Sequence, residues 1–549
     1  MSGKVSILRT VLMTMVLVLL ICDCGIYCFA AAGCDGSGNC YVRSGATSGT
    51  RTGIDWANAY IDLPANLTRG VTYWVAGGTY GGHVFNDVDS GNIAITVMAP
   101  TTVSHGTSIG WNDSYQAQAL FQSADTSGVG TIFSFTKDYY VINGTYRSSS
   151  TGNPQTDWQS ESAYGFKTDN SRAIACYANI GFGTNSATAA VVVHDITFEY
   201  VDVNGSHANT DAGCRENGID NDWGSYNLTV SNNYIHDVGA SMLFLHGQHC
   251  ANGSVVPPPC TRGTAPGGGT YGPANNESFE YNYFSRNYST ANYHAEGGSI
   301  SEGTQDLTLA YNYWQDINGT AIIAPASACD FNNCNQNNGP WYIYGNVVLM
   351  TSCAAASGGS GANAKNPGIA NFFYLFDSQF SGNVYIINNT IANYGTGCGL
   401  GSGVMLGDGG YTNPMQAVYV MNNAWVGAAQ ISISNACPTS NGLPTCTSMT
   451  WTDNAYFATT DSSPSNDSDP GKQVATSNAI FNSAASFDYR LASDTSVGAV
   501  TSAILAANAT DLLGTARGAD GTWDRGAFQV PSASASMPSP PTGLTATVR

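Results

Sequence analysis

Apolar and polar residues recur in a fixed pattern between residues 218 and 457, and each recurrence is centred on an Asn. An apolar residue stands three places before this Asn and another stands two places after it. The members of the Asn column are Asn233, Asn282, Asn312, Asn346, Asn389, Asn423 and Asn454, at spacings of 49, 30, 34, 43, 34 and 31 residues. A supersecondary unit repeated in this way predicts a solenoid.

Strands account for the repeat better than helices, because apolar residues alternate along each unit and few positions follow a helical period. Two of the units read Val-Ser-Asn-Asn-Tyr-Ile at 230–235 and Phe-Glu-Tyr-Asn-Tyr-Phe at 279–284. They resemble the PbH1-type repeats of the pectate-lyase superfamily, which implies an all-β, right-handed parallel β-helix. In such a stack each Asn side chain can hydrogen-bond to its equivalent one coil away. The resemblance specifies the fold and not the reaction.

The expected domain organisation is one β-helix over residues 33–530 and a Pro/Ser-rich tail over 531–549. Residues 55–60 resemble the amphipathic helix that caps the first coil in many β-helix proteins, and residues 71–80 resemble the first strand. Residues 487–528 resemble the last coil and final strand. Long insertions rich in turn-forming residues are expected at 147–190, 247–275, 326–339 and 352–368.

Residues 1–32 have the features of a secretory signal peptide. Lys4 and Arg9 precede an apolar run at 11–21, and Ala30–Ala32 offers a small-residue cleavage site. We therefore expect a secreted, extracellular protein without a membrane span, because the apolar run is short. A cell-surface lipoprotein anchored through Cys34 is the alternative.

Twelve cysteines follow the signal segment, and an even number in an exported chain indicates disulfide bonds. Their spacing does not determine the connectivity. Neighbours along the chain suggest the pairs Cys34/Cys40, Cys176/Cys214, Cys250/Cys260, Cys329/Cys334, Cys353/Cys398 and Cys437/Cys446.

The net charge is −20, with only 18 Lys and Arg residues. Phosphate recognition needs clusters of basic residues, so the composition argues against a nucleic-acid partner. The partner we expect is a polysaccharide. No cofactor is expected, and a structural or catalytic Ca²⁺ is the alternative, since a polyanionic substrate would need basic residues or bridging Ca²⁺. The sequence leaves the oligomeric state open.

The resemblance implies that a second strand of each coil, between the Asn-centred units, lines a binding face. These strands fall at 218–223, 241–246 and 298–302. Ionisable side chains gather on or beside these three consecutive coils, and we predict that the catalytic residues are Asp220, Asp222, His246, His294, Glu296 and Glu302. The aromatic residues best placed to stack on a sugar are Trp223, Tyr293 and Trp341.

The separation of two of these carboxyl groups bears on the reaction. Glu302 lies two coils beyond Asp222, which corresponds to about 10 Å at the usual spacing of strands. Inverting glycosidases hold their carboxyl groups about 6.5–9.5 Å apart and retaining enzymes about 5–5.5 Å, so the estimate favours inversion. A register shift of one residue would instead direct Glu302 inward. His294 and Glu296 form the other candidate acid/base pair.

Each candidate also has a structural interpretation. Asp220 and Asp222 can satisfy backbone groups of a turn or bind a structural Ca²⁺. His246 can serve as a hydrogen-bonding loop residue. His236-Asp237 and Gln315-Asp316 occupy equivalent places after the Asn column, and we interpret them as structural turn residues.

These features predict a carbohydrate-active protein, with a polysaccharide hydrolase that uses paired carboxylates on adjacent coils as the leading hypothesis. A Ca²⁺-assisted polysaccharide lyase is an alternative that requires a Lys or Arg as the base. The basic residues near the candidate coils are Arg215, Arg262, Arg286 and Lys365. The other alternative is a non-catalytic surface or adhesive β-helix that binds glycan.

Overall fold

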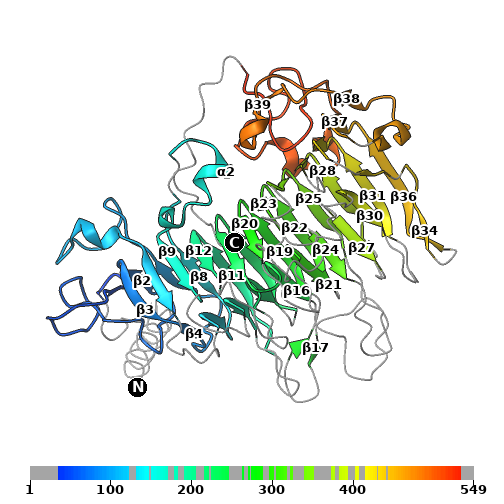
Figure 1. Ribbon diagram of the computed structural model, residues 1–549. Coiled ribbons are helices and arrows are strands. Elements are labelled where there is room, and N and C mark those ends of the chain that lie inside the picture. The colour runs from blue at the N-terminus through cyan, green and yellow to red at the C-terminus, as the bar shows by residue number, and fades with distance from the viewer. Residues whose placement is uncertain are drawn as a thin grey trace, which may run out of the picture.

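A computed structural model gives the arrangement of the chain (Figure 1). The described residues are 35–122, 131–147, 150–170, 178–183, 191–205, 216–221, 224–246, 263–264, 270–271, 274–287, 296–301, 304–317, 322–325, 339–351, 373–376, 382–393, 402–406, 415–428, 431–433, 435–440, 443–460 and 462–532.

Three long parallel sheets, here named A, B and C, form the body of the molecule. Along the chain a strand of sheet A is followed by one of sheet B and then usually one of sheet C, and each strand pairs with its equivalent in the next coil. This is the right-handed parallel β-helix that the repeat predicted. Figure 1 shows the strands stacked in order from the blue N-terminal coils to the orange C-terminal coils.

The strands have the following bounds. Sheet A contains β1 (Asn39–Val42), β2 (Thr72–Val75), β5 (Ile95–Met98), β8 (Tyr140–Asn143), β11 (His194–Glu199), β14 (Tyr226–Ser231), β19 (Ala274–Glu280), β22 (Thr304–Ala310), β25 (Trp341–Tyr344), β28 (Val384–Ile387), β31 (Met415–Met421) and β36 (Cys446–Thr452). Sheet B contains β3 (Gly78–Gly81), β6 (Ala119–Gln122), β9 (Phe166–Asp169), β12 (Val201–Asn204), β15 (Tyr234–Val238), β20 (Tyr283–Asn287), β23 (Tyr313–Gln315), β26 (Val347–Leu349), β29 (Thr390–Ala392), β32 (Ala424–Val426), β37 (Ala455–Phe457) and β38 (Gln473–Ala475). Sheet C contains β4 (His83–Phe85), β7 (Phe133–Phe135), β10 (Ile180–Phe182), β13 (Ile219–Asn221), β16 (Leu243–His246), β21 (Gly298–Ser301), β24 (Ile322–Pro325), β27 (Phe373–Phe376), β30 (Ser402–Leu406) and β33 (Ile431–Ser432).

Short elements lie outside the three sheets. The hairpins are β17 (Gly263–Thr264) with β18 (Thr270–Tyr271), β34 (Thr439–Ser440) with β35 (Leu443–Pro444), and β39 (Phe481–Ser483) with β40 (Asp488–Leu491). The helical turns are α2 (Pro154–Asp157), η1 (Asp113–Gln116), η2 (Glu161–Ala163), η4 (Ser463–Asn466), η5 (Ala484–Ser486), η6 (Thr501–Ala503) and η7 (Ala506–Ala509).

The Asn column forms a continuous buried ladder at the corner between sheets A and B. Nδ2 of Asn233 donates to Oδ1 of Asn282 at 3.0 Å, and the same bond repeats at 2.9–3.2 Å up to Asn454. From Asn233 to Asn423, the backbone N–H of each member also donates to Oδ1 of the next member. All members are fully buried, so the ladder satisfies polar groups that would otherwise be costly at a tight corner.

An aromatic cluster caps the N-terminal end of the solenoid. The prediction of a helix at 55–60 is wrong. This segment forms bends and turns, because the Asp55 carboxylate accepts from both the backbone N–H and the side-chain amide of Asn58, at 2.8 and 2.9 Å. The indole of Trp56 is fully buried against Tyr41 at 5.0 Å. The N–H of Tyr60 donates to the Tyr41 carbonyl, so the segment also covers the edge of β1.

Two further expectations about the boundaries are corrected. Residues 147–190 are not one insertion, because β9 and β10 within them are regular members of sheets B and C. Residues 487–528 do not form a last coil: β40 pairs antiparallel with β39, and Leu505, Leu512 and Phe528 pack on the outside of the solenoid in one cluster with Tyr344 and Ile387. The last solenoid strand is β38.

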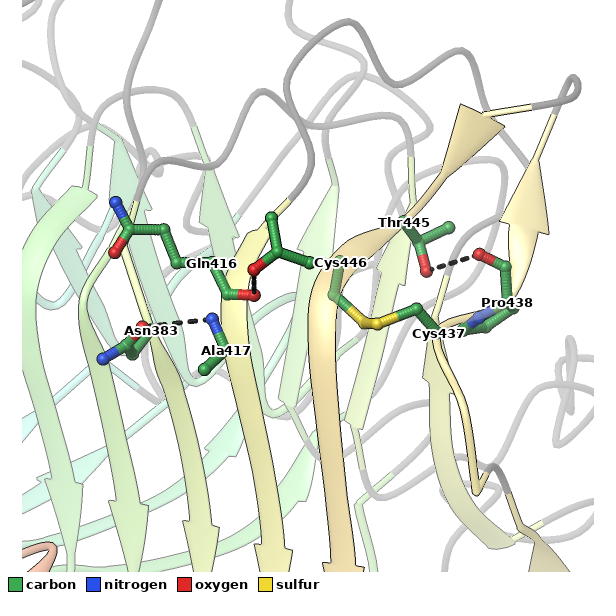
Figure 2. The surroundings of a disulfide bond; sticks show 8 residues. Asn383, Gln416, Ala417, Cys437, Pro438, Thr445 and Cys446 are labelled. Atoms are coloured by element: carbon green, nitrogen blue, oxygen red, sulfur yellow. Dashed lines mark hydrogen bonds between the residues drawn. A yellow bond between two sulfur atoms is a disulfide. The ribbon is translucent and has the colours of Figure 1, made fainter.

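One predicted disulfide, Cys437–Cys446, is confirmed and joins the segment before β34 to the first residue of β36 (Figure 2). Its sulfur atoms are 2.02 Å apart, and Oγ1 of the adjacent Thr445 donates to the Pro438 carbonyl at 3.0 Å. Cys40 is also disulfide-bonded. In each of the other predicted pairs at least one cysteine lies outside the described residues. Within the described ranges, no helix has the length and apolar character needed to cross a bilayer.

Candidate functional site

A strip of small and apolar residues crosses the first strands of sheet C and ends at a carboxylate. Val84, Ser134, Gly181 and Asp220 pair in one column through β4, β7, β10 and β13. The buried neighbours of Asp220 on β13 face the core, so Asp220 itself faces outward. Among the described residues, a Cβ added to Gly181 would meet only the Thr131 side chain, at 3.4 Å, so none of them fills the space directly above this glycine.

Exposure decreases along this column. Val84 is 50% exposed, Ser134, Gly181 and Asp220 are half-buried, and the next two members, Phe244 and Ser299, are buried. Oδ2 of Asp220 accepts a hydrogen bond from the Asn217 amide at 3.0 Å. Asp220 therefore stands where the accessible part of the column ends, with one oxygen held in place by a neighbour.

A second group of polar residues lies at the turn that leads from sheet B into sheet C. Glu216 is fully buried and accepts from the Asn170 amide at 3.1 Å and from the Gly239 N–H at 2.9 Å. Two coils beyond Glu216, the Asn287 amide donates to the Glu296 carbonyl at 3.2 Å. The Glu296 side chain is half-buried. These bonds fix the backbone that precedes each candidate strand.

The strand register places two of the predicted acids, Asp220 and Glu296, well apart. The N–H of Met242 donates to the Glu296 carbonyl, and Asp220 pairs with Phe244. Two coil steps and three residues then separate Asp220 from Glu296, or about 14 Å between their backbones. This is a separation of backbones, and the two side chains would have to extend toward one another to reach the carboxyl separations of glycosidases.

The other predicted residues have different outcomes. Asp222, Trp223, Tyr293, His294 and Glu302 lie outside the described residues, as does the side chain of His246. The sequence predicted Asp222 and Glu302 in one column. The register pairs Asn221 with Leu245 and His246 with Ser301, so Ser301 and not Glu302 occupies the column that follows Asn221 by one residue.

The prediction that Trp341 stacks on a sugar is wrong. Its side chain is fully buried in the core, 6.3 Å from the ring of Phe373, and its Nε1 donates to the Thr304 carbonyl at 2.9 Å. Trp341 opens β25 of sheet A and pairs with Leu307 and Val384, which are also core residues. An indole without exposed surface offers no face to a ligand.

A second cluster of ionisable groups, which we name the His236 network, lies on the outside of sheet B. Its members are Glu161, Lys167, Asp202, His236, Asp237 and Arg286. The fully buried His236 has Nε2 at 2.7 Å from Oδ1 of Asp202 and Nδ1 at 2.6 Å from Oδ2 of Asp237. The Tyr234 ring stacks on the imidazole at 4.0 Å.

Cations complete the His236 network on both sides. The Lys167 ammonium lies 3.1 Å from Asp202 and 2.6 Å from Glu161. Arg286 donates from Nε and Nη2 to the two oxygens of Asp237, at 2.9 and 2.7 Å. Every buried charge therefore has an opposite charge in contact, which is the condition for tolerating charges away from water.

The network shifts the pKa values of its members in consistent directions. Burial alone would lower the pKa of His236, but Asp202 and Asp237 outweigh it and the pKa is raised, which favours an imidazolium. Burial likewise opposes ionisation of Asp237, but Arg286 and His236 hold its pKa well below the usual value. The pKa of Arg286 is raised, because its contacts with Asp237 outweigh burial.

The donor atoms of Glu161, Asp202 and His236 lie within 4.8 Å of one another, which is close enough to hold a metal ion. They do not fit one here, because the Lys167 ammonium already lies between Glu161 and Asp202.

A second carboxylate group is formed by Asp494, Asp520 and Asp524. Both oxygens of Asp524 are occupied by protein donors, including the N–H groups of Thr495 and Val530, so this group is interpreted as structural.

The sequence interpretation treated His236 and Asp237 as turn residues and missed the network around them. A usable signal was present: His236, Ser285 and Gln315 each stand three places after a member of the Asn column and pair in one row of sheet B. A polar row on a strand face indicates that the face does not belong to the apolar core and meets polar groups or solvent.

No family model matches the sequence, and no curated protein matches it. Among solved structures, the chain is similar to pectate lyase Pel9A at 13% identity, over 73% of this chain and 80% of that chain, with a TM-score of 0.36. It is also similar to the PL6 family polysaccharide lyase Pedsa3628 from Pseudopedobacter saltans, at 12% identity over 74% and 88% of the two chains and a TM-score of 0.32.

A third similar structure is the catalytic unit of the GH87 alpha-1,3-glucanase from Streptomyces thermodiastaticus strain HF3-3. The identity is 14% over 74% of this chain and 63% of that chain, with a TM-score of 0.29. The parallel β-helix of this chain is established by its own sheet order and Asn ladder.

Proposed function

We propose that the protein is a secreted polysaccharide hydrolase that binds a neutral or mildly acidic glycan along the outer strip of sheet C. The observation that carries this proposal is the position of Asp220 at the end of the accessible strip formed with Val84, Ser134 and Gly181. Small side chains allow a polymer to lie close to the sheet, and a carboxylate at the end of the strip supplies a group for acid or base chemistry.

Hydrolysis requires a second carboxyl group, and the candidates are Asp222, Glu296 and Glu302, with His246 and His294 as further acid/base groups. Asp222 and Asp220 are two residues apart in sequence, which corresponds to about 6.6 Å along an extended strand. That spacing falls within the range of inverting glycosidases, so we assign the pair Asp220 and Asp222 as the leading acid/base set.

The charge distribution favours a hydrolase over a lyase. A lyase needs a basic side chain that can take up a proton, and Arg286 is the candidate of this kind within the described residues. Its guanidinium donates to both oxygens of Asp237 and its pKa is raised, so it does not act as a base. The net charge of −20 also disfavours a strongly anionic glycan.

A polysaccharide panel tests the proposal. The full chain and an Asp220→Asn variant are incubated with neutral glucans, mannans and xylans and with polyuronates, and both reducing ends and ultraviolet absorbance of unsaturated products are followed. We expect reducing ends from a neutral glycan without unsaturated products, and a loss of about 10²–10⁴-fold in the variant. Unsaturated products would establish a lyase instead. Binding without any product would establish the adhesive alternative.

A further inference from the structure

A cavity of about 490 Å³ lies where residues 478–489 meet the turn after β29, away from sheet C. The residues that matter for its chemistry are Asn393, Asn478, Phe481, Ser483, Phe487 and Tyr489. The remaining described residues of the lining are alanines, so none of the described residues brings a charged side chain to the cavity. Aromatic rings combined with amide and hydroxyl groups are suited to a neutral, polyhydroxylated ligand.

Two buried aromatic rings form the floor of the cavity. Phe481 and Tyr489 are 5% and 1% exposed, and their rings meet edge to face at 5.5 Å. The hydroxyl of Tyr489 accepts a hydrogen bond from the Asn393 amide at 2.9 Å. The floor is therefore rigid, and Asn393 ties it to the solenoid.

Several polar groups at the cavity remain available to a ligand. Among the residues that the structure describes, no acceptor receives the hydroxyl proton of Tyr489 and no donor reaches Oδ1 of Asn393. The side chain of Asn478 is exposed at the rim. A Cβ at Gly427, whose φ is +61°, would lie only 2.5 Å from Oδ1 of Asn393, so glycine keeps this oxygen unobstructed.

Phe487 forms the accessible aromatic wall and has an unfavourable backbone conformation. Its φ is +62° and its ψ is 19°, at the end of η5, where glycine would be the inexpensive residue. A left-handed conformation is unfavourable for a residue other than glycine, because its Cβ lies too close to the following carbonyl oxygen. The ring is half-buried, so it packs on one side and leaves another accessible. Strain of this kind is often retained where a side chain contacts a ligand.

We propose that this cavity binds a neutral sugar ring, with Phe487 stacking on the ring and Asn393, Asn478 and Tyr489 hydrogen-bonding to its hydroxyl groups. The inference rests on the proposed function only for the class of ligand, a glycan. β30, which follows β29, lies five strand steps from β13 in sheet C, or about 24 Å along the axis. The cavity is therefore a separate binding position from Asp220.

The test is calorimetric titration of the full chain with neutral trisaccharides (cellotriose, mannotriose and xylotriose) and with trigalacturonate as the charged comparator. We expect one of the neutral sugars to bind and trigalacturonate not to bind. Phe487→Gly should weaken binding at least about tenfold, which corresponds to the loss of a stacking contact. Phe487→Tyr should bind within about threefold of the parent, because it keeps an aromatic ring for stacking.

Phe487→Gly removes the backbone strain but also the packing of the half-buried ring, so its folding is checked by its melting temperature before titration. Equal affinity of the parent and Phe487→Gly would overturn the inference, as would the absence of binding by any neutral trisaccharide. If Phe487→Gly does not fold, Asn478→Ala takes its place, and an unchanged affinity in that variant overturns the inference. Phe487-dependent binding without hydrolysis of any glycan would refute the proposed function alone.

Discussion

The outer faces of sheets B and C carry ionisable residues in opposite circumstances. On sheet B, Asp202 and His236 are fully buried beneath the segment that contains α2 and η2, and each charged group contacts an opposite charge. On sheet C, Asp220 is half-buried at the end of an accessible strip and accepts from an amide, Asn217. The first arrangement stabilises a covering segment. The second holds a half-buried carboxylate at the end of the strip, where we propose that it serves a ligand.

This difference shows that an ionisable side chain on the outer face of a β-helix cannot be assigned a functional or a structural role until its contacts are known. A buried charge needs an opposite charge, and satisfying it consumes its hydrogen-bonding capacity. His236 has both ring nitrogens beside carboxylates, so neither is available for chemistry. Four predictions test this comparison through the free energy of unfolding.

The largest effect is expected on the covered face. Asp202→Asn should lower the free energy of unfolding by about 3–5 kcal/mol, because His236 and Lys167 would lose the carboxylate that offsets their burial. Denaturant unfolding of the full chain measures it.

Asp138 provides a matched control. With Asp195 it contacts the two ring nitrogens of His194, as Asp202 and Asp237 do for His236, but at a more exposed site. Asp138→Asn should cost about 1 kcal/mol or less. Equal losses in the two variants would show that burial does not distinguish the two clusters.

The next effect is a pH dependence of stability. The folded-state pKa of His236 is raised, so its stabilisation is complete below the unfolded value near 6.5 and is lost as the pH rises through the folded value. Each unit of elevation corresponds to about 1.4 kcal/mol. Asp237 has a lowered pKa, so its contribution is present above about pH 3.8 and is lost only in acid.

The measurement is unfolding of the parent and of His236→Gln between pH 5 and 9, a range assigned from the usual His pKa. His194 also has a raised pKa, so the difference between the two proteins isolates His236. We expect the variant to lose less stability than the parent on the alkaline side. Parallel curves would contradict an imidazolium at this position.

Much of the fold could be predicted because the Asn column repeats an interaction that is local to each corner. Asn233 and Asn282 are 49 residues apart in sequence, yet the apolar positions around each are the same. The two repeats could therefore be aligned without knowledge of the loop between them. The features that failed depend on contacts with other parts of the chain. Asp55 forms a side-chain turn in place of a helix, and residues 487–528 pack on the outside of the coils.

The candidate site was less predictable, for a related reason. The pattern correctly placed Asp220 on an outward position of a sheet C strand. Trp341 was misassigned because the alternation along β25 was overlooked. Trp341 lies two residues before the core residue Ile343, so its side chain also points into the core. The role of His236 depends on Asp202 and Lys167, which lie 34 and 69 residues earlier and whose partnership no local pattern shows.

A smaller effect is expected at the edge of the covered face. Glu161 contacts Lys167 at 2.6 Å, but its side chain is 51% exposed. Glu161→Gln should therefore change the free energy of unfolding by about 0–1 kcal/mol, since exposed ion pairs contribute little. The loss should also shrink at high salt. A loss as large as that of Asp202→Asn would mean that Glu161 belongs to the buried part of the network.

The smallest effect is expected at Asp220. Asn has nearly the same shape as Asp, and its carbonyl oxygen can still accept from the Asn217 amide, so the free energy of unfolding should change by about 0.5 kcal/mol or less. Calorimetric melting of the parent and Asp220→Asn measures this change alongside the glycan assays. A stable but inactive variant would show that the accessible carboxylate serves a ligand. If instead the variant lost stability in proportion to activity, Asp220 would be a structural residue like Asp202, and the distinction between the two faces would fail.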